Sequence, residues 1–86
     1  MKIKIDPHTL IRAEERGTDP NEIIEIIKNG NPTPAKYNCQ GKTKVFEYRK
    51  ERKGKYYEQK KVKVIYVIED DLLTTVTVYV FYGKWL

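Results

Sequence analysis

The chain has very few of the residues from which disulfides and metal centres are built. Its 86 residues include one cysteine, Cys39, and one histidine, His8. A single cysteine cannot form an intramolecular disulfide, and neither a cysteine cluster nor a multi-histidine zinc site can be assembled. We therefore expect no metal or other cofactor, and a reducing cytoplasm as the default location.

Long apolar segments and glycine-rich nucleotide motifs are missing as well. Residues 1–6 alternate lysine and isoleucine, and no apolar stretch approaches the length that crosses a bilayer. We therefore expect neither a secretory signal nor a membrane anchor. The sequence has no P-loop, no Gly-x-Gly-x-x-Gly string and no Gly-x-Ser-x-Gly string. Nucleotide hydrolysis and serine-hydrolase chemistry are thus without support.

What is present suffices for one small domain, residues 1–86, that buries about three-fifths of its unfolded surface. Apolar residues make up 40% of the chain and the mean hydropathy is −0.69, which is low for a fold but above the disordered regime. Nine isoleucines, seven valines and seven tyrosines supply the bulk for one sheet-centred core.

The net charge of +5 is concentrated in one part of the chain. Residues 1–31 hold five basic and six acidic side chains, whereas residues 42–63 hold ten basic side chains and three glutamates. One end of the fold should be strongly electropositive, as expected for a nucleic-acid or other polyanion partner. The alternative is a lysine-rich hairpin that only keeps the protein in solution.

Two helices are predicted near the start, after a short strand at residues 2–5. Asp6 and Pro7 are typical of an N-cap and a first helical position, and Gly17 suits a left-handed cap after a helix that ends near Arg16. Asp19 and the proline after it repeat this start. The second helix carries four isoleucines within an arc of about 160°. It ends at residues 29–32.

Everything after Pro34 is predicted to be strand, at residues 37–39, 43–48, 61–68 and 74–82. Gly41 is expected in a turn, residues 50–60 as a projecting loop or a long twisted hairpin tip, and residues 69–71 as a hairpin connection. The order β-α-α-β-β-β predicts an α+β fold with two N-terminal helices on one face of an antiparallel sheet.

Alternation along the last two predicted strands assigns their faces. The side toward the helices should carry the apolar set Val62, Val64, Tyr66, Ile68, Val76, Val78 and Val80. The other side, which nothing obviously covers, should carry Lys61, Lys63, Thr75, Thr77, Tyr79 and Phe81. Tyr79, Phe81 and Trp85 could stack on bases there, although filling a small core is the commoner role of an aromatic. The threonines are good strand formers, which alone can explain them.

A polar stripe marks the first helix. His8, Arg12 and Arg16 are four residues apart and span an arc of about 80°, opposite a side expected to face the core with Leu10, Ala13 and Gly17. Two like charges at this spacing are unfavourable by a few tenths of a kcal/mol, and a bound anion would relieve that repulsion.

Each residue of the stripe has a chemical and an ordinary interpretation. Histidine can exchange a proton near neutral pH, and guanidinium groups clamp phosphates. However, a lone histidine in a first turn is commonly a surface residue. Glu15 and Asp19 lie three residues from Arg12 and Arg16 and are available as ion-pair partners, and Arg16 could also cap the helix end.

The stretch from His8 to Ile23, a His-x-x-x-Arg-x-x-x-Arg-Gly helix followed by an Ile-rich one, resembles a family of domains of unknown function found widely in bacteria and archaea. Pro32 or Pro34 and the Val/Thr-rich residues 74–79 fit its later features. The family is grouped with the RelE/ParE/BrnT toxin-like fold, which includes many endoribonucleases and some gyrase poisons. The resemblance implies a RelE-like fold and matches its polar helix positions to His8, Arg12 and Arg16, with Thr75 or Thr77 from the last strand.

The leading hypothesis is a small RelE-like toxin-type domain, a metal-independent endoribonuclease that cuts RNA by attack of the ribose 2′-hydroxyl. His8 would transfer protons, Arg12 would hold the phosphate oxygens, Arg16 would bind phosphate or hold the helix end, and Thr75 would join them. The RNA backbone would be gathered by Lys42, Lys44, Arg49, Lys61, Lys63 and Tyr79.

Two alternatives remain open. One is a non-catalytic nucleic-acid-binding or ribosome-binding module that uses the same basic surface. The other is an interaction domain whose open sheet takes up a small acidic antitoxin protein. The second alternative is compatible with a toxin, because a free nuclease needs restraint.

Overall fold

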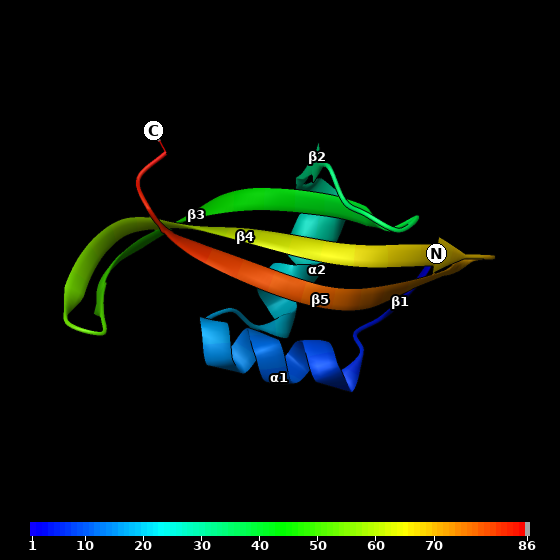
Figure 1. Ribbon diagram of the computed structural model, residues 1–86, viewed down its shortest axis with the longest axis horizontal. Helices are drawn as coiled ribbons and strands as arrows, with labels where there is room; N and C mark the ends of the chain where they lie inside the picture. Colours follow the sequence, from blue (N-terminus) through cyan, green and yellow to red (C-terminus); the bar gives the residue numbers. More distant parts are fainter. Residues whose placement is uncertain (86) are drawn as a thin grey trace.

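Two helices cover one face of a five-stranded sheet (Figure 1) in the computed structural model, which describes residues 1–85. The elements follow the order β1 (Lys2–Lys4), α1 (Pro7–Arg16), α2 (Pro20–Asn29), β2 (Asn31–Thr33), β3 (Gln40–Arg52), β4 (Lys55–Glu69) and β5 (Leu72–Gly83). Within the sheet the strands are ordered β1-β5-β4-β3-β2. The α+β prediction is confirmed.

The predicted antiparallel β-α-α-β-β-β sheet is wrong in two respects. β1 runs parallel to β5, so the sheet is mixed, and β2 adds a fifth strand beside β3. Three residues that include a proline are too few to give an alternation signal, so β2 could not be found from the sequence. The direction of β1 relative to β5 depends on how the chain runs through the two helices and back to the sheet. No local sequence pattern specifies this path.

Both helices begin and end where the cap residues predict. The Asp6 carboxylate accepts a hydrogen bond from His8 N at 2.9 Å, and the Asp19 carboxylate accepts one from Glu22 N at 2.9 Å. Gly17 ends α1 at a φ of 96°, and a Cβ there would lie 2.2 Å from Tyr82 Oη. Glycine is therefore required at this position both by the left-handed backbone and by the close approach of β5.

The core lies between the helices and the covered face of the sheet, where β4 contributes its apolar alternation and α2 its isoleucines. The buried apolar residues are Ala13, Ile23, Ile26, Ile27, Val62, Val64, Tyr66, Leu73 and Val78. On α1 the buried side is formed by Thr9 and Ala13. Leu10, expected on that side, is 40% exposed, because the helix is rotated toward Thr9.

A β-bulge in β5 reverses two of the predicted faces. Ile65 pairs with Thr77 and Tyr66 pairs with Thr75, so Val76 has no partner on β4. The extra residue shifts the alternation by one. Thr75 is therefore buried at 2% exposure, whereas Val76, predicted to face the helices, is 42% exposed on the opposite side.

The β3–β4 hairpin projects beyond the helices (Figure 1), in the second of the two arrangements expected for residues 50–60. Arg52 pairs with Lys55, so residues 50–60 form the hairpin tip rather than a loop. The strand predicted at residues 37–39 is wrong, because this segment is a turn that leads into β3. Gly41 lies inside β3, where a Cβ would come within 3.0 Å of Thr33 Cγ2 on β2. Its glycine thus permits close strand approach rather than a turn.

Within residues 1–85, no helix is long and apolar enough to span a membrane.

Candidate nucleic-acid interface

The polar stripe of α1 separates into three environments. His8 is exposed in the first turn. Arg12 Nη1 lies 3.1 Å from Glu15 Oε1 in an exposed ion pair. Arg16 turns toward β5. In the part of the chain that the structure describes, no hydrogen bond or ion pair joins any two of these three side chains.

Arg16 connects α1 to the edge of the sheet. Its Nη1 donates to Val78 O at 2.6 Å, and its guanidinium carbon lies 5.2 Å from the centre of the Tyr79 ring. β1 pairs with only the first three residues of β5, so the remainder of that edge needs other donors. Arg16 supplies one, and its stacking on Tyr79 fixes a ring at the border of the uncovered sheet face.

Thr75 is used inside the fold. Its Oγ1 accepts a hydrogen bond from Asp6 N at 3.0 Å. The same hydroxyl donates a hydrogen bond to Thr9 Oγ1, also at 3.0 Å. These bonds attach the start of α1 to β5. The hydroxyl lies on the helix-covered side because of the bulge, which no sequence pattern revealed.

Two lysines predicted to bind nucleic acid lie under α2 instead of on the uncovered face. Lys42 Nζ donates to Ile27 O at 2.7 Å, in the last turn of α2 where the helix dipole favours a cation. Lys44 Nζ is paired with the Glu25 carboxylate. Hydrogen bonds from Lys44 and then from Asn29 hold the pKa of Glu25 below its ordinary value of 4.5. Lys42 and Lys44, which share one face of β3, thus bind α2 to the sheet.

Lys60 on β4 also binds the helical layer to the sheet, a role that was not predicted from the sequence. The residue is 8% exposed, and its Nζ donates to Gly17 O and to Glu22 Oε1, both at 2.8 Å. Within the run of basic residues, alternation could have signalled this position, because Lys60 shares its face with Val62.

Arg49 lies at the irregularity between β3 and β4, with a φ of 50°. Its Nε is 3.3 Å from Glu47 Oε2 in an exposed pair. The hydrogen bond from Gln59, followed by the charge of Arg49, holds the pKa of Glu47 below its ordinary value of 4.5 despite some desolvation. This arginine is accessible but partly neutralised by its neighbour.

The side of β3, β4 and β5 turned away from the helices, here called the open face, gathers the remaining predicted residues. It carries Lys61, Lys63, Tyr79, Phe81 and Trp85. Tyr79 is 41%, Phe81 50% and Trp85 36% exposed, and Lys61 Nζ lies 5.7 Å from the centre of the Trp85 ring. Neither lysine forms an ion pair with an aspartate or glutamate of residues 1–85.

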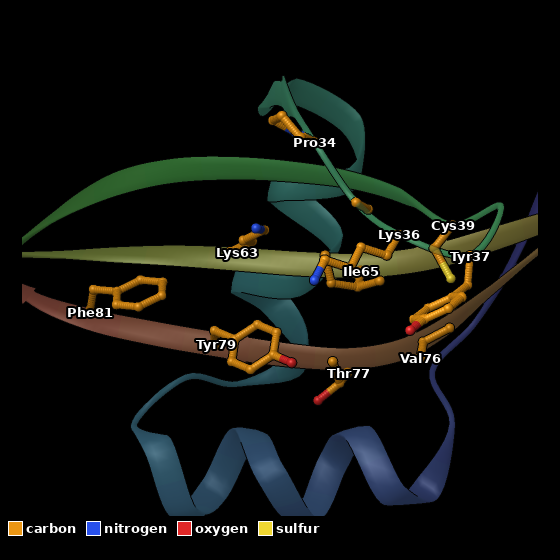
Figure 2. Close-up of a pocket in the computed structure, with 11 residues that line it drawn as sticks. Pro34, Lys36, Tyr37, Cys39, Lys63, Ile65, Val76, Thr77, Tyr79 and Phe81 are labelled. Carbon is orange, nitrogen blue, oxygen red and sulfur yellow. The ribbon is translucent and has the colours of Figure 1, made fainter.

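A hollow of 590 Å³ indents the open face where the loop of residues 34–39 bends over the strands, here called the loop hollow (Figure 2). Tyr37 and Val76 lie at one end and Phe81 at the other (Figure 2). Lys36 and Lys63 line it too, and none of its lining residues is acidic. Lys36 and Tyr37 were missed, because the segment was interpreted as a strand although proline and asparagine around it indicate a turn.

In the comparisons with known proteins, no family model matches the chain, and neither a curated protein nor a solved structure matches it.

Proposed function

We propose that the protein binds single-stranded nucleic acid, specifically RNA, on the open face. The observation that carries this proposal is the joint exposure of Tyr79, Phe81 and Trp85 on the one sheet face that also presents Lys61 and Lys63. Sheets that bind single strands use this combination, in which aromatic rings stack on two or three bases and cations follow the backbone.

Exposed aromatic rings support stacking rather than a structural role. Partly exposed rings leave apolar area in water, which is unfavourable by about 25 cal/mol per Å² unless a partner covers it. A base covers such a ring with its own flat face, and this stacking is worth about 1–3 kcal/mol per base. The guanidinium of Arg16 lies 5.2 Å from the centre of the Tyr79 ring and favours one orientation of that ring before a base arrives.

The lysines of the open face supply the electrostatic part of the proposal. Each phosphate neutralised on a single strand lowers the slope of log affinity against log salt by about 0.7. Lys61 and Lys63 point to the open face from β4. If each neutralises one phosphate, together they should make this slope more negative by about 1.4.

The test measures anisotropy of a labelled, unstructured RNA of about 8 nucleotides over a salt series from about 50 to 200 mM. Lys61→Ala and Lys63→Ala, separately and combined, should weaken binding and flatten the slope. Lys28→Ala is the matched control, because Lys28 is an exposed lysine on α2, which covers the other side of the sheet. Equal affinity of the combined variant and the control would contradict the proposal.

RNA cleavage in a RelE-like fold is the second candidate. The contact of Arg16 with Tyr79 favours it, because it brings one end of the α1 stripe to the border of the open face. In such a reaction the 2′-oxygen bonds to phosphorus and the bond to the 5′-oxygen breaks. His8 would take the proton of the 2′-hydroxyl and return a proton to the 5′-oxygen, while Arg12, released from Glu15, would hold the phosphate oxygens.

Cleavage is tested with the same RNA, incubated with the wild type, His8→Ala and Arg12→Ala and resolved on a gel. Both variants should lose nearly all product while remaining folded. RNA carrying 2′-deoxyribose throughout is the substrate control, because it has no internal nucleophile. Product formation from both variants at the wild-type rate would remove this mechanism and leave binding as the function.

A further inference from the structure

The turn that borders the loop hollow holds a tyrosine in an unfavourable backbone conformation. Tyr37 and Asn38 have φ values of 56° and 61°, and Cys39 N donates to Lys36 O at 3.0 Å across them. Two consecutive left-handed residues are the arrangement of a type I′ turn, for which glycine and asparagine are the usual residues. Asn38 fits this preference, because the short polar side chain of asparagine can hydrogen-bond to the nearby backbone, whereas tyrosine has no such compensation for its Cβ.

Packing within the protein does not compensate for this conformation. Tyr37 is 91% exposed, so its ring contributes little to the core. Strained residues persist where the strain serves a ligand clamp or a similar site. The position of the ring at the rim of the loop hollow is therefore the feature that requires an explanation.

The chemistry of the loop hollow fits a flat aromatic ligand that carries negative charge. Its apolar surface comes from Ile65 and Val76 on adjacent strands, and Tyr37 stands at its rim (Figure 2). Lys36 and Lys63 add two cations without an acidic lining residue. The volume of 590 Å³ lies within the range of about 300–1,000 Å³ that is typical of small-ligand sites.

We propose that Tyr37 clamps one unstacked base of a bound single strand in the loop hollow, with the adjoining phosphates held by Lys36 and Lys63. This inference rests on the proposed binding of nucleic acid to the open face. A stacked base covers one face of the exposed ring, which explains why a tyrosine is kept in a left-handed position. The clamp gives selectivity for single strands, because the bases of a duplex do not offer a free flat face.

The first experiment compares Tyr37→Gly with Tyr56→Ala in RNA binding and in urea unfolding. Glycine adopts a positive φ freely, so the variant keeps the turn, and Tyr37→Asn is the second variant that tolerates this backbone. Tyr56 is a matched control, since it is 52% exposed at the hairpin tip and does not line the hollow. Tyr37→Gly should weaken binding roughly 5- to 140-fold, the loss of one stacked base. Its urea midpoint should be unchanged or higher, and the control should bind as the wild type does.

The second experiment detects occupancy of the hollow directly. Cys39 lines the loop hollow and is the only thiol of the chain, so its alkylation by iodoacetamide reports access. Bound RNA should slow alkylation in the wild type but not in Tyr37→Gly at the same fractional saturation. An RNA with 2-aminopurine at one position should show quenched fluorescence with the wild type alone.

The outcomes separate the clamp from the binding function. If the wild type binds RNA through Lys61 and Lys63 while Tyr37→Gly keeps full affinity and full protection of Cys39, the clamp is overturned and the proposed function stands. A fall in the urea midpoint that accounts for the lost binding would make the tyrosine structural and overturn the clamp. Equal affinity for duplex RNA would do the same. If the wild type binds no RNA at low salt, both proposals fail together.

Discussion

The buried ammonium group of Lys60 gives the sharpest test of how this small fold is held together. Its Nζ donates to the carbonyl oxygen of Gly17, the residue that follows α1, and to the carboxylate of Glu22, each at 2.8 Å. The Glu22 carboxylate also accepts a hydrogen bond from Thr18 Oγ1 at 2.8 Å. One lysine of β4 thereby joins the connection between the two helices to the sheet.

Lys60→Met should lower the free energy of unfolding by about 3 kcal/mol. Breaking a buried pair typically costs about 3–5 kcal/mol, because the remaining charge is left uncompensated. The Glu22 side chain is 22% exposed, so water partly replaces the ammonium group and the lower end applies. For a domain of this size, about 1 kcal/mol corresponds to about 4–8 °C in Tm, so Tm should fall by roughly 12–24 °C.

Urea unfolding followed by circular dichroism measures this loss, and Lys61→Met is the control. Lys61 is the next residue of the same strand but lies on the open face, so its replacement should change stability by no more than about 0.5 kcal/mol. Glu22→Gln in the Lys60→Met background should restore about 1–2 kcal/mol by removing the isolated charge. Equal urea midpoints for Lys60→Met and Lys61→Met would refute the reasoning.

Three further predictions concern stability. Thr75→Val removes the buried hydroxyl that bonds to Thr9, and should cost about 1–3 kcal/mol in urea unfolding without changing RNA affinity. The hydrogen bond from Lys44 lowers the pKa of Glu25 in the folded protein. The contribution of Glu25 to stability is therefore present above about pH 4.5 and is lost as the pH falls through the pKa of the folded state. Lys44→Met should make the urea midpoint fall less steeply with decreasing pH. Burial raises the pKa of Tyr82 above 10.0, so its contribution is present below pH 10.0 and is lost as the pH rises toward the folded value. Tyr82→Phe should therefore make the urea midpoint less sensitive to pH above 10.0, and an unchanged alkaline decline would contradict this assignment.

Predictions from the sequence were correct where a residue acts on the backbone close to it in the chain. Asp6, Asp19 and Gly17 act on backbone groups within a few residues, so both helices were placed correctly. The hairpin between β4 and β5 was also found, because alternation on both sides leaves only the acidic residues 69–71 for the connection, and Asp70 there has a φ of 55°.

The side on which a lysine lies was harder to predict than the presence of positive charge. The basic stretch indicated an electropositive surface, yet Lys42, Lys44 and Lys60 bind the helices from the covered side. Their long side chains reach carbonyl and carboxylate groups that are distant in sequence. Charge composition contains no information about such partners, so the open face retains fewer cations than the sequence suggested.

The amino-acid sequence by itself determined the two capped helices, the strand-rich second half, the alternation of β4 and the candidate aromatic residues. All of these follow from interactions within about four residues along the chain or from a period of two. Only the tertiary structure decided the parallel direction of β1, the bulge that exchanges Thr75 with Val76, and the separation of Arg12 from Arg16. It also placed Tyr37 at the rim of the loop hollow. These features depend on contacts between segments far apart in sequence, where a shift of one residue changes which face a side chain occupies.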